Sequence, residues 1–341
     1  MVLTLPGAPW LIAHRSMLDV NSPYKITLNG TDYVLWQNSD GKISALENIC
    51  PHMQAPLSEG WVCAERNTLA CPFHALEFDG TGRFVNTDLA AEQTSLKRSS
   101  AKPLAKPLEI VVQGDFIWTY ANQEPVLEIP TLHEKITAGS VLVGVAGDRT
   151  LKADFLSAVM VNYDFNHATA THRYPLNLQK IIVSDYTVDG PNSSLDQELI
   201  RGGNSWLEKL RDPALAFTPG RYVNRFEYRF PSTTCLSADL PSGQVISLFM
   251  LYPESETRTK TFVLVFAKTA YRWLVPLLRK ATLKAFERVV DQDADMLAKL
   301  YKRDAPKIRL PNEEIMFRAE KLYHHWPDSV STSQRLKKDI F

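Results

Sequence analysis

The sequence predicts an α+β protein with two domains: an all-β N-terminal domain, and a C-terminal domain in which a sheet surrounds one long helix. Three observations predict this fold class. The length of 341 residues is close to that of two domains of ~150 residues each. Short apolar runs separated by turn dipeptides fill the first third of the chain. Longer strand patterns and one long helical pattern fill the rest.

The N-terminal domain is predicted from its turns. Asn29-Gly30 and Asp40-Gly41 separate three apolar runs, and such dipeptides are strong hairpin signals. The expected strands are residues 25–28, 33–37, 43–46, 76–78, 110–112 and 116–120. Residues 122–130 contain two prolines, which disfavour helix and indicate an extended linker. We therefore expect a first domain at residues 1–121, a linker at 122–140 and a second domain at 141–341.

The C-terminal domain is predicted from the change of pattern beyond this linker. Residues 151–171 have helical periodicity, and residues 277–302 have the pattern of a long helix. The expected strands are residues 180–186, 222–230, 245–252 and 261–267. Strands that form a sheet around one long helix indicate an α+β domain.

Charge and hydropathy argue against three classes of protein: nucleic-acid binders, secreted proteins and membrane-spanning proteins. Lysine and arginine number 38, as do aspartate and glutamate, so the net charge is zero, whereas nucleic-acid binders carry a positive excess. The first twelve residues lack a basic segment and are interrupted by Pro6 and Pro9, unlike a secretory signal. The most apolar stretch, residues 262–278, contains Lys268 and Arg272 and is shorter than the ~20 residues that span a bilayer. We expect a cytoplasmic protein that binds neither nucleic acid nor membrane.

Two Cys–His pairs form the first candidate site. Cys50-Pro-His52 is followed, after 18 residues, by Cys71-Pro-Phe-His74. Two thiolates and two imidazoles suit either zinc or a 2Fe–2S cluster in which two His replace two Cys on one iron. A single residue between Cys50 and His52 favours the cluster, because each loop then gives one ligand to each iron, while zinc loops usually place two or more residues between ligands.

A second candidate site combines two histidines with a late aspartate. His167 and His172 are ~140° apart on a regular α-helix, so they share a metal only if the helix widens or if His172 lies past its end. A mononuclear iron that activates dioxygen needs two His and one carboxylate. Asp293 lies within the apolar stripe of the expected helix, whereas Asp291 and Asp295 point to solvent. The stripe consists of Leu278, Ala285, Phe286, Val289, Met296, Leu297 and Leu300. A salt bridge of a buried Asp293 is the alternative to metal binding.

The cluster loops resemble those of Rieske proteins. The resemblance rests on residues 48–60, on Cys71-Pro-Phe-His74 and on the following Phe78-Asp-Gly80. Respiratory-chain Rieske proteins join the two loops by a disulfide, but Ala55 and Ala75 stand near those positions, so the resemblance is to the disulfide-free type. Cys63 is expected to be a buried small hydrophobe. Ala75-Leu76 departs from the Gly-Trp of many oxygenases.

The whole chain resembles the α subunit of Rieske non-haem iron oxygenases. This resemblance implies a Rieske domain, a helix-grip catalytic domain with an antiparallel sheet, and a homotrimer. It implies that a 2Fe–2S cluster is held by Cys50, His52, Cys71 and His74, and that a mononuclear Fe(II) is held by His167, His172 and Asp293. Asp164 would be the acid that links the two centres of neighbouring subunits. Because no Gly-x-Gly-x-x-Gly motif is present, a separate reductase or ferredoxin must supply electrons.

A narrower resemblance suggests a substrate. Residues 5–17 and 307–316 are similar to the cyanobacterial hydroxylases that tailor saxitoxin, which implies dioxygen-dependent hydroxylation of a guanidinium alkaloid. Acidic residues or aromatic faces should then line the pocket to meet the cation. Two alternatives stay open: another Rieske monooxygenase or demethylase substrate (a quaternary amine, an aromatic or a tetrapyrrole), and a Rieske electron carrier whose second domain is not catalytic.

Overall fold

The structure is a computed structural model that describes residues 5–85, 102–131, 136, 138–202, 218–241, 243–301 and 306–328. The chain divides into two compact units, Pro9–Pro125, and Val126–Phe341 together with Met1–Ala8. The change of unit at Pro125 lies within the segment that the sequence marks as a linker. In the described part of the chain, no helix is both long and apolar enough to cross a bilayer.

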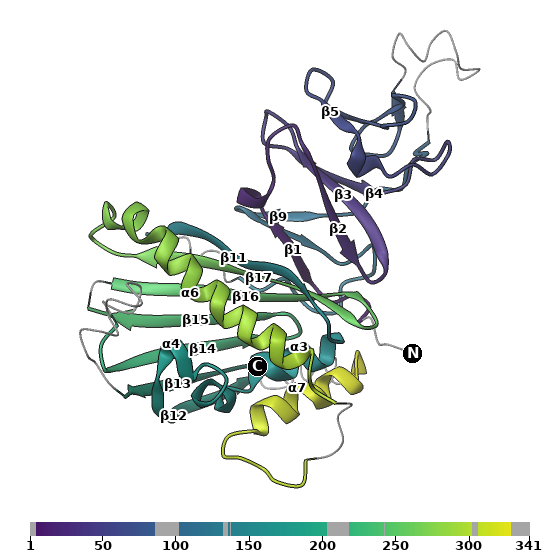
Figure 1. Cartoon of the computed structure of the whole chain (residues 1–341). Coiled ribbons are helices and arrows are strands. Elements are labelled where there is room, and N and C mark those ends of the chain that lie inside the picture. The colour runs from purple at the N-terminus through teal and green to yellow at the C-terminus, as the bar shows by residue number, and fades with distance from the viewer. Residues whose placement is uncertain are drawn as a thin grey trace, which may run out of the picture. The chain divides into compact units, whose positions relative to one another are not determined.

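The first unit consists of three small antiparallel sheets (Figure 1). Their strand orders are β1-β10-β9, β2-β3-β4 and β5-β6-β7-β8. The strands are β1 Trp10–His14, β2 Pro23–Leu28, β3 Thr31–Gln37, β4 Ile43–Glu47, β5 Trp61–Cys63, β6 Thr68–Ala70, β7 Glu77–Phe78, β8 Phe84–Val85, β9 Val111–Gln113 and β10 Phe116–Thr119; the short 3₁₀ helices are η1 Arg15–Met17 and η2 Leu57–Glu59. The predicted all-β character of this part is confirmed.

The turn signals located the central hairpin correctly. Asn29 and Gly30 have φ of 51° and 81°, as a two-residue turn between β2 and β3 requires, and Leu28 pairs with Thr31. The sequence analysis missed β1, β5, β6 and β8. All five residues of β1 are buried, and the other three strands have only two or three residues each. None of the four therefore shows an alternation of apolar and polar positions long enough to detect.

The second unit is built on one seven-stranded antiparallel sheet with the order β11-β17-β16-β15-β14-β13-β12 (Figure 1). Its strands are β11 Val141–Leu151, β12 Leu178–Asp189, β13 Asn192–Arg201, β14 Arg221–Arg229, β15 Thr233–Leu240, β16 Gly243–Ser255 and β17 Arg258–Lys268. The helices are α3 Phe155–Tyr163, η3 Asn166–Thr169, α4 Arg173–Leu176, α6 Leu274–Leu297 and α7 Glu314–His324. The predicted sheet around one long helix is confirmed.

The long helix α6 crosses one face of this sheet (Figure 1). Val290 of α6 packs with Val143, Val263 and Val265 of the sheet, and Leu283 adds to this core. The predicted stripe was therefore wrong in part: Met296 and Leu300 are exposed, and Leu283 and Val290 take the inward positions. The helix ends at Leu297, before the predicted end at residue 302, which lies outside the described residues.

A glycine in β11 permits this close packing. An added Cβ at Gly147 would lie 2.7 Å from Cγ2 of Val290, and Gly147 has a φ of 61°. A side chain at this position would therefore both clash with α6 and strain the backbone.

The helix predicted at residues 151–171 is shorter and broken. Leu151 ends β11, and α3 begins after its N-cap Asp154, whose carboxylate accepts from the Ser157 N–H (3.0 Å). The helix ends at Tyr163 because Asp164 is extended and its Oδ1 accepts from the Asn166 N–H (2.9 Å), which competes with helical bonding. This break places the two histidines of the second candidate site on separate short elements.

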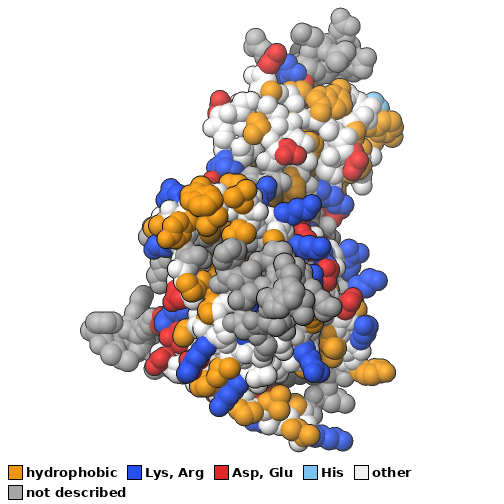
Figure 2. All heavy atoms as spheres, turned by 60° about the vertical axis from the view of Figure 1, so that its left-hand side comes forward, with side chains coloured by type: hydrophobic (Ala, Val, Ile, Leu, Met, Phe, Trp, Pro, Cys, Tyr) orange, Lys and Arg blue, Asp and Glu red, His pale blue; other side chains and the backbone are white. Residues whose placement is uncertain are grey.

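The face shown in Figure 2 carries mixed charge and a group of exposed hydrophobic side chains. On the face shown in Figure 2, basic and acidic side chains are interspersed, in keeping with zero net charge. Hydrophobic side chains also gather there, on the side where α6 begins (Figure 2). Tyr271, Trp273 and Leu277, at the start of this helix, expose at least half of their surface.

Candidate functional site

The two Cys–His loops share one backbone conformation. In the first, the Cys50 N–H donates to the carbonyl of Ala55 (2.8 Å), and the Gln54 N–H donates to the carbonyl of Cys50 (2.9 Å). Cys71 makes the same two bonds with the residues five and four positions later, at 2.9 and 3.0 Å. Gln54 and Ala75, each four residues after its cysteine, have φ of 61° and 55°. Two sequences with different Cys–His spacing therefore fold into the same turn.

These loops separate thiols from imidazoles. Cys50 and Cys71 are buried, whereas His52 and His74 are exposed, with ring centroids 4.7 Å apart. Each loop thus offers one inner sulfur and one outer nitrogen, which suits a 2Fe–2S cluster with two Cys on one iron and two His on the other. Among the described residues, these four do not form a group with ligand atoms close enough to share a single ion. The set therefore fits the cluster rather than one zinc ion.

No disulfide joins the cysteines, all four of which lie among the described residues. Burial raises the pKa of the Cys50 thiol to about 11, so a bound metal would be needed to stabilise its thiolate. Cys63 is half-buried and lies beside Glu77, whereas the sequence analysis expected it to be fully buried.

Asn48 braces the first loop, and the sequence analysis did not single it out. It is buried, its Oδ1 accepts from the Ser58 N–H (2.7 Å), and its Nδ2 donates to the Ser58 hydroxyl (2.9 Å). Ser58 lies in η2, so these two bonds tie the two ends of the loop together. A buried amide with both groups paired fixes a loop because breaking either bond leaves an unpaired polar atom.

The second candidate site brings two histidines and one aspartate together. The Nε2 atoms of His167 and His172 are 3.1 Å apart, and each lies 3.3 and 3.2 Å, respectively, from Oδ1 of Asp293. Two ligands at right angles and about 2.1 Å from one first-row ion are about 3.0 Å apart. The three atoms therefore fit three neighbouring positions around a single ion, with the remaining positions open.

Three separate elements supply these side chains. His167 lies in η3, His172 precedes α4, and Asp293 comes from α6. His172 thus lies past the end of a helix, which is one of the two arrangements that the spacing allowed. Asp291 points away and pairs with Arg149, and Asp295 is exposed, as the helical register predicted.

Gln292 orients one histidine and was not found from the sequence. The ring nitrogen Nδ1 of His172 lies 2.9 Å from Oε1 of Gln292, whose Nε2 donates to the carbonyl of Tyr174 (2.6 Å). A donor–acceptor bond to the far nitrogen fixes the ring and its tautomer, with Nε2 directed to the ion position. Gln292 lies next to Asp293 but outside the apolar stripe, so its sequence position carried no signal.

Asp164 lies near His167 without bonding to it. Its Oδ2 is 3.9 Å from Nδ1 of His167, which has no hydrogen-bond partner among the described residues. The two residues do not share a helix, because α3 ends at Tyr163 and His167 lies in η3.

The charged form of Asp293 and the protonated form of His167 stabilise each other. Burial alone would lower the pKa of His167, but the bond and the charge of Asp293 outweigh burial and raise it, with a smaller contribution from Asp164. Burial would raise the pKa of Asp293, but its bonds to His167 and His172 lower it. Asp293 is therefore held as a carboxylate, the form that a cation binds.

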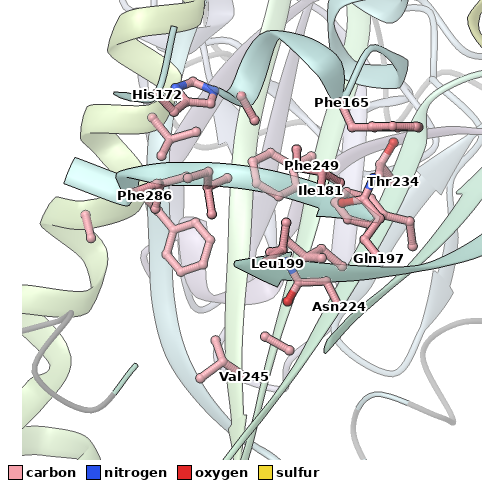
Figure 3. A pocket seen from close by; sticks show the side chains of 18 of the residues that line it. Phe165, His172, Ile181, Gln197, Leu199, Asn224, Thr234, Val245, Phe249 and Phe286 are labelled. Carbon is pink, nitrogen blue, oxygen red and sulfur yellow. The ribbon is translucent and has the colours of Figure 1, made fainter. Parts of the chain in front are cut away.

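An apolar cavity of about 280 Å³ opens beside this site (Figure 3). Its aromatic lining residues are Phe165, Tyr222, Phe226, Phe249 and Phe286, and its amides are Asn162, Gln197 and Asn224. The acidic residues among the described lining are Asp164 and Asp293, both at the histidine pair, and no lysine or arginine is among them. Aromatic faces, one of the two linings expected for a cationic substrate, are present, and the described lining has no acidic residue away from the histidine pair.

Two family models match the chain. Residues 9–98 match the Rieske [2Fe-2S] domain, and residues 207–327 match the vanillate O-demethylase oxygenase C-terminal domain. The N-terminal part of the chain is thus similar to a Rieske domain, and the C-terminal part is similar to an oxygenase C-terminal domain. The Rieske match contains both cluster loops, and the oxygenase match contains Asp293.

The chain is similar to curated proteins that include a monooxygenase and the oxygenase component of a demethylase. The 4beta-methylsterol monooxygenase of Methylococcus capsulatus is 29% identical over 242 residues, which cover 68% of this chain and 60% of the relative. The oxygenase component of dicamba O-demethylase of Stenotrophomonas maltophilia is 25% identical over 230 residues, or 62% of this chain and 64% of the relative. The chain thus spans about three fifths of the length of these relatives.

Solved structures share the fold over almost the whole chain. Dicamba monooxygenase bound to dicamba matches 98% of this chain and 99% of its own, with a TM-score of 0.68 and 19% identity. Another structure of dicamba monooxygenase contains non-heme iron and dicamba, with a TM-score of 0.63 and 20% identity over 99% of this chain and 100% of its own. This likeness shows that the chain shares the fold of these structures.

Proposed function

We propose that this chain is the oxygenase component of a Rieske non-haem iron monooxygenase. The observation that carries the proposal is the pairing, in one chain, of a Cys₂His₂ loop pair with an open His₂Asp site at the wall of an apolar cavity. Three protein ligands that leave open positions are typical of iron sites that activate dioxygen. An electron carrier has no need of this second site, which disfavours that alternative.

The protein side chains have defined roles in this proposal. Cys50, His52, Cys71 and His74 would hold the cluster, and His167, His172 and Asp293 would hold the mononuclear iron. When bound, these groups would supply the redox chemistry by which dioxygen, two electrons, two protons and a C–H bond yield a C–OH group and water. The cavity side chains orient the substrate and exclude water, and Gln292 keeps the His172 ring in place.

Partners and location complete the proposal. A separate reductase or ferredoxin would deliver the electrons, and the working form would be a cytoplasmic homotrimer in which Asp164 links the cluster of one subunit to the mononuclear site of its neighbour. The family resemblance supports the trimer and the role of Asp164, and the oxygenase components among the relatives support the separate electron donor.

The narrower substrate proposal is a guanidinium alkaloid of the saxitoxin type. The resemblance at residues 5–17 and 307–316 supports it, and so do the aromatic faces of the cavity, which attract cations. A neutral, largely apolar substrate is the second candidate, because the described lining carries no charged group away from the histidine site. Turnover of a panel of both kinds, measured by mass for a gain of one oxygen or loss of a methyl group, separates the candidates.

Iron content tests the metal assignment without turnover. The full chain should bind about three iron atoms, two in the cluster and one mononuclear. Asp293→Asn should lose the mononuclear iron, because its carboxylate lies against both histidines. Asp291→Asn, two residues earlier in α6, should keep the iron, because Asp291 pairs with Arg149 instead. Two iron atoms in the unaltered protein, or full iron retention in Asp293→Asn, would contradict the oxygenase proposal.

A further inference from the structure

Two buried amides face the cavity with unpaired polar atoms. Gln197 of β13 and Asn224 of β14 are 2% and 6% exposed, and both line the cavity. They lie directly opposite each other in the register of the two strands. Among the described residues, Nε2 of Gln197 and Oδ1 of Asn224 have no hydrogen-bond partner. Buried polar atoms are usually paired, so this unpaired donor beside an unpaired acceptor calls for a ligand.

Strand alternation explains why the amides point inward. On β13, Leu195, Gln197 and Leu199 are all buried on one face, and on β14, Asn224 lies between the cavity-lining Tyr222 and Phe226. These neighbours are apolar or aromatic, so a hydrophobic residue would fill either position at lower cost. The sequence thus keeps a polar pair where folding alone favours an apolar one.

The amides lie away from the histidine site. In Figure 3, His172 is at one side of the view and Gln197 at the other, with Phe249 and Ile181 between them. A molecule that reaches both ends would place its apolar body against the aromatic wall and its polar end at the amides. Contacts at that end would decide which carbon faces the open positions of the metal site.

Resting on the proposed function, we propose that Gln197 and Asn224 bind a neutral group of the substrate that both accepts and donates hydrogen bonds. A carboxamide, a carbamate or a hydroxyl group has this property. A carboxylate only accepts and a guanidinium only donates, so each would leave one of the two amide atoms unpaired. No lysine or arginine of the described lining could neutralise an anion there, and the two acidic residues lie at the histidines.

Water explains why the match must be two-sided. A ligand that enters the cavity displaces the water that would otherwise bond to both amides, and it loses affinity if it cannot replace those bonds. A ligand with a matching donor and acceptor replaces both. The two amides therefore select substrates by the hydrogen-bonding groups at their polar end, independently of the chemistry at the metal site.

Four small isosteric probes test this inference by calorimetric binding to the purified full chain without reductant. Benzamide both donates and accepts, acetophenone only accepts, benzoate is an anion, and benzamidinium is a cation that only donates. Benzamide should bind about tenfold more tightly than each of the two ions, as expected for one to two unmatched hydrogen bonds.

Variants of the two amides give a pattern that a general loss of folding does not. Gln197→Met should weaken benzamide and acetophenone about tenfold each, because both accept from Nε2. Asn224→Leu should weaken benzamide by a similar factor but leave acetophenone unchanged. Gln244→Met is the matched control, since the Gln244 amide lies on the same sheet but donates to the surface Asp239 (2.9 Å).

Three results would overturn the inference. They are equal binding of all four probes or of none, benzamide affinity that survives both cavity substitutions, and tightest binding of benzamidinium. Tightest binding of benzamidinium would mean that the Gln197 amide is turned so that its oxygen faces the cavity. The two amides would then bind a cation. Because binding is measured without turnover, failure here leaves the iron-content test of the proposed function standing, and the reverse also holds.

Discussion

At the scale of single residues, Ala75 adopts a backbone conformation that glycine would adopt at lower cost. Its φ of 55° lies in the left-handed region, where glycine is favoured, and its N–H closes the second cluster loop. Ala75→Gly should therefore keep the cluster and leave the melting temperature unchanged or slightly higher, because relief of about 1–2 kcal/mol of backbone cost offsets the added chain entropy.

A β-branched residue at the same position gives the opposite expectation. Ala75→Val should lose the visible absorbance of the cluster, since valine is a true outlier at this φ. Ala64→Val, at an exposed position between β5 and β6, is the control for the added volume. Retention of full absorbance by Ala75→Val would show that the loop does not depend on this backbone conformation.

Glu77 links protonation to the stability of the Rieske domain. This buried carboxylate accepts from Arg66 through two bonds (2.9 and 2.6 Å) and from the Thr68 hydroxyl (2.5 Å). Burial alone would raise the pKa of Glu77, but these bonds lower it below its ordinary value. A lowered folded-state pKa means that the stabilisation is present above the unfolded-state pKa of about 4.3 and is lost as the pH falls through the folded-state value.

Glu77→Gln should therefore destabilise the domain by about 1–3 kcal/mol at neutral pH and flatten the loss of stability below about pH 4.5. Urea unfolding at a series of pH values from 7 down to about 3, followed by the cluster absorbance, measures both effects. Glu65→Gln, on the exposed surface nearby, is the control and should behave as the unaltered chain. Parallel pH profiles for the Glu77→Gln variant and the unaltered chain would refute the linkage.

At the scale of elements, the contact of α6 with β11 sets the position of Asp293. Gly147→Ala would place a Cβ 2.7 Å from Val290 and impose a left-handed φ on a side chain. The expected loss is about 2–4 kcal/mol, the sum of overpacking and backbone terms. A shift of α6 would also move Asp293 from the histidines, so mononuclear iron content should fall with stability.

Gly190→Ala isolates the packing contribution. Gly190 has a φ of 57°, close to that of Gly147, but no heavy atom lies within 4 Å of an added Cβ. Its substitution should cost only the backbone term, about 1–2 kcal/mol, and leave the iron content unchanged. Equal losses of stability and of iron in the two variants would show that contact with α6 at Gly147 is unimportant.

At the scale of the whole molecule, what the sequence revealed depended on how local each signal was. Cys50 and His74 were found because their spacing is a local feature of two loops. Asp293 was found because a carboxylate within an apolar stripe is conspicuous, even though Met296 and Leu300 of that stripe proved exposed. The ligand roles of these residues stay predictions, which the metal analyses test.

The residues that were missed act through neighbours distant in the chain. Gln292 matters because His172, 120 positions earlier, packs against it, and Gln197 matters because it pairs across strands with Asn224. β13 was missed for a related reason: Gln197 on its inner face breaks the alternation of apolar and polar residues that marks a half-buried strand. Cross-strand register is fixed by tertiary packing, so no local pattern reported it.

The trimer of the proposal makes Asp164 the most informative position. Asp164 lies 3.9 Å from Nδ1 of His167, at the wall of the cavity, and holds none of the three ligand atoms of the His₂Asp site. Asp164→Asn keeps the size of the side chain and removes its charge. Cluster absorbance and iron content should be unchanged, because Asp164 supplies none of the ligand atoms. Product formation should nonetheless fall by roughly a factor of ten or more, as is typical for partners of metal-binding histidines, and oxidation of the pre-reduced cluster on mixing with substrate and dioxygen should slow in proportion.

Asp295→Asn, on the exposed face of α6, should match the unaltered chain in all four measurements. Normal product formation by Asp164→Asn in a trimer would remove its linking role, whereas loss of iron would instead make it a support of the metal site itself.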